Sequence, residues 1–143
     1  MDDKDISAVL KIMLEPLNTR KTSWRLDGSA NLKVQGIDIN VNDIDIMTDE
    51  KSYISFKNRF KKYYTDEGYD EKKKKHYLML MIAGNEVEIA HYDDPLIVML
   101  DKIKMIEWKG LKLSILPLVH AKKFYELIGK DEKAKLIEKY LHP

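Results

Sequence analysis

The 143-residue sequence contains no cysteine, and this absence removes several classes of protein at once. Disulfide staples, thiolate metal sites and catalytic thiols are all excluded, because each of them needs a cysteine sulfur. Long hydrophobic runs are missing as well. The longest mainly apolar stretches, such as residues 77–83, are too short to cross about 30 Å of hydrocarbon as a helix. We therefore expect no membrane-spanning segment.

A dominant sign of charge is also absent. The 25 basic and 24 acidic residues leave a formal net charge of +1, so the whole molecule exerts no general attraction on nucleic acid or on an acidic membrane. A nucleic-acid partner is not indicated. Residues 1–5 are mostly acidic and lack the basic start and apolar stretch of a secretory signal. These features favour a cytoplasmic protein.

The length and composition indicate one folded domain. A chain of this size buries a single core of ordinary dimensions, and hydrophobic and charged residues make up 44% and 34% of it. There is no internal repeat, low-complexity tract or proline-rich linker that would mark a boundary. We therefore expect a single domain over residues 1–143.

Hydrophobic spacing predicts alternating helices and strands, which indicates an α/β protein. Apolar residues recur at three- and four-residue intervals in the expected helices and alternate with polar residues in the expected strands. The expected helices cover about residues 3–17, 28–35, 49–64, 117–128 and 131–141. The expected strands cover residues 24–26, 37–47, 77–83, 86–91, 105–108 and 111–115, and a polar, charged connection is expected over 66–75.

Three acidic residues on the expected strands suggest a metal site. Asp43 and Asp45 are two positions apart, so on a strand they share a face, with Cα atoms about 6.5 to 7 Å apart. Glu88 offers a third carboxylate from a separate strand, although Glu86 lies on the same face and competes for this role. Magnesium prefers hard oxygen ligands and keeps positions for water and phosphate. The alternative for all these acids is a solvated strand surface.

Gly28 and Ser29 lie between an expected strand and an expected helix. Without a side chain, Gly28 lets the backbone approach a phosphate closely, and the Ser29 hydroxyl and the first helical amides donate to anionic oxygens. Ser29 also suits a simple helix cap. Lys72–Lys75 is expected to form a solvated loop outside the site.

Together these residues resemble the minimal nucleotidyltransferases of the polymerase-beta superfamily, which include small bacterial and archaeal proteins. The resemblance rests on Gly28-Ser29, Gln35-Gly36, Asp43-Ile44-Asp45 and Thr48-Asp49, and it extends to Leu116-Pro117-Leu118 and the closing helices. It implies an α+β fold with a mixed sheet flanked by helices. It also implies that Gly28 and Ser29 hold the nucleotide phosphates, and that Asp43, Asp45 and Glu88 are catalytic ligands of magnesium, as a pair of ions.

The resemblance implies a magnesium-dependent transferase that moves a nucleoside monophosphate from a nucleoside triphosphate, such as ATP, to an acceptor hydroxyl. Asp27 stands where a neutral residue is expected, and its charge would oppose triphosphate binding unless a metal ion or a basic group screens it.

Two alternatives to catalysis stay open. One is a noncatalytic nucleotide- or metal-binding module, such as part of a toxin-antitoxin-like pair, and the other is a structural interaction protein. The sequence identifies neither the acceptor nor the preferred base, and the short chain leaves room for a protein partner or a homo-oligomer.

Overall fold

The computed structural model describes residues 1–143 and contains two β-sheets. The larger sheet has five strands: β1 (Trp24–Asp27), β2 (Ile44–Thr48), β3 (Tyr64–Asp70), β4 (Lys75–Ile82) and β5 (Asn85–Tyr92). The smaller sheet pairs β6 (Lys104–Trp108) with β7 (Leu111–Ile115). The order in the larger sheet is β1-β2-β5-β4-β3, in which only β2 and β5 run parallel. The sheet is therefore mixed, as the resemblance implied.

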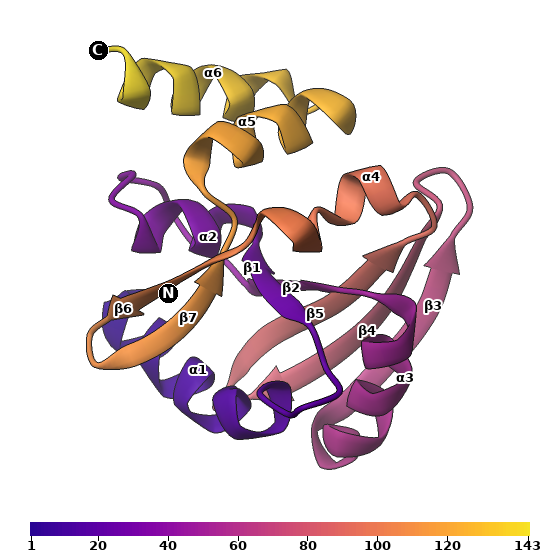
Figure 1. Ribbon diagram of the computed structural model, residues 1–143. Helices are drawn as coiled ribbons and strands as arrows, with labels where there is room; N and C mark the ends of the chain where they lie inside the picture. Colours follow the sequence, from indigo (N-terminus) through magenta and orange to yellow (C-terminus); the bar gives the residue numbers. More distant parts are fainter.

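Six α-helices and two short 3-10 helices surround the larger sheet (Figure 1). The α-helices are α1 (Asp3–Leu17), α2 (Gly28–Val34), α3 (Glu50–Arg59), α4 (Pro95–Val98), α5 (Leu118–Leu127) and α6 (Asp131–Leu141). The 3-10 helices are η1 (Lys61–Tyr63) and η2 (Leu100–Lys102). None of the helices combines the length and apolar character that a membrane crossing demands.

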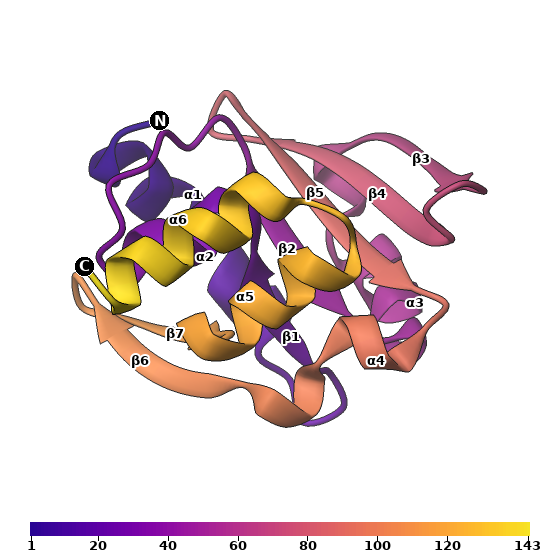
Figure 2. The ribbon, with the colours of Figure 1, turned by 90° about the horizontal axis from the view of Figure 1, so that it is seen from above.

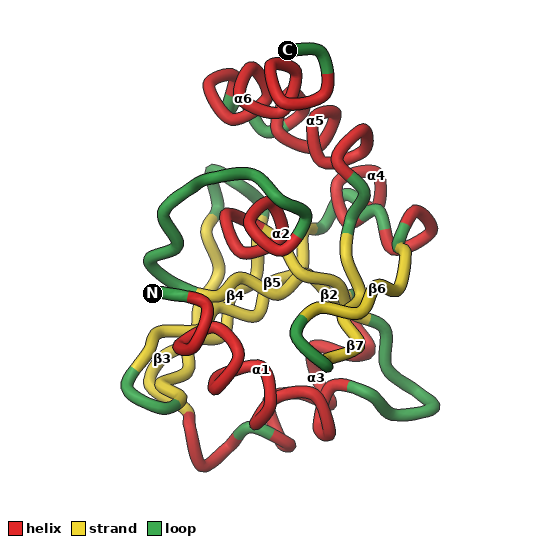
Figure 3. The backbone as a smooth tube through the Cα atoms, turned by 90° about the vertical axis from the view of Figure 1, so that its left-hand side faces the viewer, coloured by secondary structure: helices red, strands yellow, loops and turns green.

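One face of the larger sheet forms the main hydrophobic core. Because side chains alternate along a strand, every second residue of the central strands faces α1 and α3. Figure 3 shows these two helices together on one side of the sheet, opposite α5 and α6. A capping box between Asp2 and Asp5 starts α1, whose apolar stripe then packs into the core. The buried strand residues of this face include Leu26, Ile44, Ile46, Val87 and Ile89.

The other face carries a second, smaller core beneath α5 and α6, which lie over the sheet in Figure 2. Met47 points to this side from β2, while Phe124 and Tyr125 reach it from α5 and Ile137 from α6. This core covers only part of the face. The remaining part is lined by charged side chains.

Two secondary-structure expectations were wrong. Residues 37–41 form no strand, although Ile37 and Val41 are buried and the residues between them are more exposed. Both edges of β2 are already paired, with β1 and β5, so this segment has no strand to join there. The polar segment 66–75 was expected as a connection, but most of it belongs to β3 and to the start of β4. Backbone hydrogen bonding to β4 holds this exposed edge strand, so it shows no apolar alternation.

Candidate active site

Three carboxylates lie in register on neighbouring strands. Asp27 of β1 is paired with Asp45 of β2, and Asp45 is paired with Glu88 of β5. Paired residues share a face, and neighbouring strands lie about 4.8 Å apart. We call Asp27, Asp45 and Glu88 the acid row. The structure therefore brings the predicted residues Asp45 and Glu88 to the same side of the sheet and adds Asp27 to them.

Asp43 lies in the bend that precedes β2, not within the strand. Its charge nevertheless reaches the acid row, because it contributes to the raised pKa of Asp45. Glu86, the competing candidate, is exposed near the start of β5 and is paired with Met81. Register thus favours Glu88 over Glu86 as the neighbour of Asp45.

Asp45 is the electrostatic centre of the acid row. Burial is the main cause that raises its pKa to about 8, and the charges of Asp27, Asp43 and Glu88 add to it, while Lys133 opposes the increase. A carboxyl group in this environment keeps its proton at neutral pH unless a cation compensates its charge. A strongly raised pKa in a cavity is typical of functional sites.

Both the backbone conformation at position 28 and the closeness of Asp45 require a glycine there. Its φ of +60° is unfavourable for other residues, and a Cβ atom built there would lie 2.2 Å from Oδ2 of Asp45. Any side chain at this position would displace the Asp45 carboxylate. This contact is a reason for glycine at position 28 in addition to the phosphate binding that the sequence resemblance implies.

Ser29 lies in the first turn of α2 and is not the helix cap. The N-cap is Asp27, whose side chain makes no capping hydrogen bond. The hydroxyl Oγ of Ser29 instead accepts from Nζ of Lys133 at 3.4 Å. This contact joins the turn after β1 to α6, which are more than 100 residues apart in the chain.

A pocket of about 460 Å³ opens over the acid row. The sheet contributes all three acids, and the helical side contributes Lys130 and Lys133. Three further lysines come from the run that the sequence argument had placed outside the site: Lys72, Lys73 and Lys75. Folding of β3 against β4 brings this run to the pocket, which no local pattern in the sequence indicated.

Two acids of the row already have basic partners. Nζ of Lys75 lies 2.8 Å from Oε1 of Glu88, and Nη1 of Arg25 lies 3.2 Å from Oδ1 of Asp27. Burial is the largest single effect and lowers the pKa of Lys75, but the hydrogen bond to Glu88 and the nearby negative charges, including those of Glu88 and Asp45, together raise it above its ordinary value. Arg25 is fully buried and also donates to the carbonyl oxygen of Val98 at 2.8 Å. A basic group therefore screens Asp27.

Aromatic rings complete the pocket. Tyr92, Phe124 and Tyr125 line it, and the Tyr92 and Phe124 rings meet edge to face at 6.4 Å. Nζ of Lys133 lies 5.3 Å from the centre of the Tyr125 ring. Burial, followed by the charges of Asp27 and Asp45, raises the pKa of Tyr125 and keeps it neutral. The pocket thus combines carboxylates, ammonium groups and flat apolar surfaces.

The residues fit magnesium in chemistry, although their side chains do not converge as they stand. No three acidic or histidine side chains are close enough together to hold a metal ion. Glu88 is bound by Lys75, so metal binding by Glu88 requires this ion pair to open. The donors are carboxylate oxygens, which magnesium prefers, and the buried Asp45 needs a cation in order to ionise.

Comparison with solved structures identifies the fold. A Thermotoga maritima protein provisionally described as a nucleotidyltransferase superposes with a TM-score of 0.77 at 25% sequence identity, over 99% of this chain and 95% of that chain. The lincosamide antibiotic adenylyltransferase LnuA, with lincomycin bound, gives 0.62 at 12% identity, over 96% of this chain and 97% of that chain.

The antibiotic-resistance factor ANT(2'')-Ia gives a TM-score of 0.63 at 10% identity, over 99% of this chain and 86% of that chain. No protein-family model and no curated protein sequence matches the chain. The structural likeness covers nearly the whole chain in all three cases. The chain therefore has the nucleotidyltransferase fold, which the sequence resemblance had implied.

Proposed function

We propose that this chain of nucleotidyltransferase fold is a magnesium-dependent enzyme that transfers a nucleoside monophosphate from a nucleoside triphosphate to an acceptor hydroxyl. One observation carries the proposal: Asp45 and Glu88, in register on parallel strands, line one pocket together with a cluster of lysines. Carboxylates and lysines that line the same pocket match a ligand that brings both metal ions and phosphates.

Asp43, Asp45 and Glu88 would hold magnesium. When bound, the metal neutralises charge on the reacting phosphate and makes the acceptor hydroxyl more acidic. Gly28 keeps the backbone close to Asp45. The acceptor oxygen forms a bond to the α-phosphorus, the bond from that phosphorus to the bridging oxygen breaks, and pyrophosphate leaves with those electrons. The hydroxyl proton passes to water.

The lysines would bind the outer phosphates and stabilise the leaving pyrophosphate. Lys133 is placed for this role, because it already lies between the Ser29 hydroxyl and the ring of Tyr125. Lys75 would leave Glu88 for a phosphate oxygen, which frees Glu88 for the metal. Tyr92 and Tyr125 offer flat surfaces on which a nucleotide base can stack.

The neighbours support small-molecule transfer. The two antibiotic-related structures include an adenylyltransferase with a bound lincosamide. By analogy we expect ATP as the triphosphate and a small organic molecule with a hydroxyl group as the acceptor.

Transfer of a labelled monophosphate tests the proposal. The purified chain is incubated with magnesium, α-labelled triphosphates and a panel of hydroxyl-bearing acceptors, and the product and pyrophosphate are measured. We expect Asp45→Asn to abolish transfer, since the variant cannot provide the carboxylate. Asp66→Asn, on the exposed strand β3, is the matched control and should retain the full rate. Equal rates for the two variants would reject the assignment.

The ion pair between Lys75 and Glu88 favours a second candidate, a noncatalytic nucleotide-binding module within a two-component system. A permanently closed pair would remove one metal ligand while leaving lysines for phosphate. Calorimetry separates the two candidates. Triphosphate binding with no pyrophosphate release across the whole acceptor panel supports the module, and turnover by the isolated chain removes it.

A further inference from the structure

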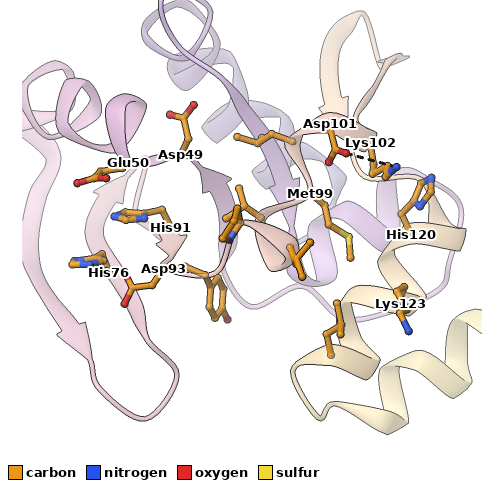
Figure 4. A pocket seen from close by; sticks show the side chains of 16 residues that line it. Asp49, Glu50, His76, His91, Asp93, Met99, Asp101, Lys102, His120 and Lys123 are labelled. Carbon is orange, nitrogen blue, oxygen red and sulfur yellow. Dashed lines mark ion pairs between the residues drawn. The ribbon is translucent and has the colours of Figure 1, made fainter.

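A second and larger pocket adjoins the first. Its volume is about 1010 Å³, and it lies where the parallel strands β2 and β5 end and where α3 and α4 begin (Figure 4). Tyr92 and Leu127 line both pockets. The two cavities therefore share a wall, and a molecule in the second pocket lies next to whatever occupies the first.

The second pocket has walls of opposite charge. Figure 4 shows Asp49, Glu50 and Asp93 on the side of the strand ends, together with His76 and His91. His120 and Lys123 of α5 lie on the opposite side, beside Asp101 and Lys102, which pair with each other. Because the charges are separated in this way, the pocket suits a molecule that carries both signs better than one that carries a single sign.

Two of the three acids already have partners within the chain. Oδ1 of Asp49 accepts from the backbone nitrogen of Ser52 at 2.8 Å, and Asp93 accepts from the hydroxyl of Tyr69 at 2.5 Å. Glu50 and Lys123, in contrast, form no ion pair with any residue. Glu50 on α3 and Lys123 on α5 are thus charges without an ion-pair partner on opposite sides of the pocket (Figure 4).

The space between the two charges is apolar. Leu96, Val98, Met99 and Leu100 line it from α4 and the start of η2, and Leu96 is 74% exposed. A carbon framework placed here would cover these side chains and remove their surface from water, which is favourable. The pocket thus matches an organic body with a charged group at each end.

We propose that the second pocket holds the acceptor and that the acceptor is a dipolar small molecule with an ammonium group, an acidic group and a hydroxyl. The ammonium group lies near Glu50, the acidic group near Lys123, and the hydroxyl is directed past Tyr92 toward the acid row. This inference rests on the proposed function, in which that oxygen forms a bond to the α-phosphorus while pyrophosphate leaves and the proton passes to water.

Three phenols that differ only in charge test the inference. Tyrosine carries both charges, tyramine carries only the ammonium group, and 3-(4-hydroxyphenyl)propionate carries only the acid. Their dissociation constants are measured by NMR titration of the labelled, folded chain with magnesium present. We expect tyrosine to bind most tightly, and we expect the NMR chemical-shift changes to be confined to residues around the second pocket.

Two charge variants assign the ends. Glu50→Gln should weaken binding of tyrosine and tyramine by about two- to five-fold, since exposed ion pairs contribute at most about 1 kcal/mol. The dissociation constant of 3-(4-hydroxyphenyl)propionate should not change. Lys123→Met should weaken tyrosine and the acid by a similar factor and leave tyramine unchanged. Asp66→Asn and Lys135→Met, which remove charges outside both pockets, should change none of the three constants.

Equal binding of the three phenols, no binding, or shifts elsewhere on the protein overturns the inference. So does occupation of the second pocket by the nucleotide itself, seen as shifts around Glu50 and Lys123 on addition of magnesium and a nonhydrolysable ATP analogue. The nucleotide titration also separates the two levels of argument. If the analogue binds the first pocket and the phenols fail, the proposed function stands and only the acceptor assignment falls.

Discussion

The two faces of the larger sheet are built from the same strands but differ in almost every physical respect. On the face toward α1 and α3, residues such as Ile46 and Ile89 are buried in the main core. On the other face, the residues next to them in sequence are Asp45 and Glu88, which line a pocket with lysines. A period of two along the strand thus places a dry core and a charged cavity within one residue of each other.

Stability and chemistry are thus divided between the two faces of the sheet. The apolar face contributes the free energy of burial, which the charged face offsets in part because Asp45 is held where ionisation is unfavourable. Substitutions on each face should therefore affect different properties of the protein.

Truncation of a core side chain should destabilise the protein without changing the groups that line the pocket. Ile89 is fully buried on β5, so Ile89→Ala should lower the free energy of unfolding by about 2 to 5 kcal/mol, through lost burial and the cavity left behind. Urea denaturation measures the change. A loss below about 1 kcal/mol would show that this face is not the main source of stability.

Replacement of Asp45 by a residue that does not ionise should instead raise the free energy of unfolding. The folded pKa of about 8 lies above the ordinary value of 3.8, so the native state keeps a proton that the unfolded chain has lost. The contribution of Asp45 to stability therefore falls as the pH rises from about 4 to about 8. Asp45→Asn does not titrate and should be more stable than the parent by on the order of 2 kcal/mol near pH 7.

The advantage of Asp45→Asn should shrink as the pH falls toward the ordinary pKa of 3.8, below which both states of the parent are protonated. Urea denaturation at several pH values in the absence of magnesium measures this trend. Asp66→Asn on the exposed strand β3 is the control and should change stability by less than about 0.5 kcal/mol at each pH. A destabilised Asp45→Asn at pH 7 would contradict an electrostatic penalty at this position.

Lys133 should contribute to nucleotide binding, in contrast to its neighbours on α6. Lys133→Met removes an ammonium group that faces the pocket and should weaken binding of magnesium-ATP by about tenfold, equal to about 1.4 kcal/mol. Lys135→Met, at an exposed position of the same helix, should change binding by less than about twofold. Calorimetry compares the two variants. An equal loss of affinity would mean that Lys133 contributes only to the overall positive charge of the protein and makes no specific contact with the nucleotide.

The smallest effect concerns the ion pair on the charged face. Lys75→Met frees Glu88, so the nucleotide-free protein should bind magnesium about two- to five-fold more tightly, while its affinity for ATP should fall. Calorimetric titration with magnesium alone tests the first part. An unchanged or weaker affinity for magnesium would mean that Glu88 is not held back by Lys75.

Local sequence patterns predicted the helices and hairpins that form between residues close together in the chain. The apolar stripe and acidic start of α1 gave its bounds, and the hairpins of β4 with β5 and of β6 with β7 were expected at nearly the observed positions. The strand expected over 37–41 was wrong because alternation of burial does not require a sheet partner. Strand β3 was missed because backbone pairing at an exposed edge leaves no hydrophobic signature.

The sequence by itself determined which residues alternate on a strand, and so it placed Asp45 and Glu88 among the candidates together with the glycine turn at Gly28. Only the tertiary structure decided that Asp27 completes the acid row and that Lys75 and Lys133 face it. The two kinds of feature depend on interactions that span different distances along the chain. The direction of a side chain follows from its own strand, whereas the register between distant strands and the docking of α6 follow from packing of the whole core.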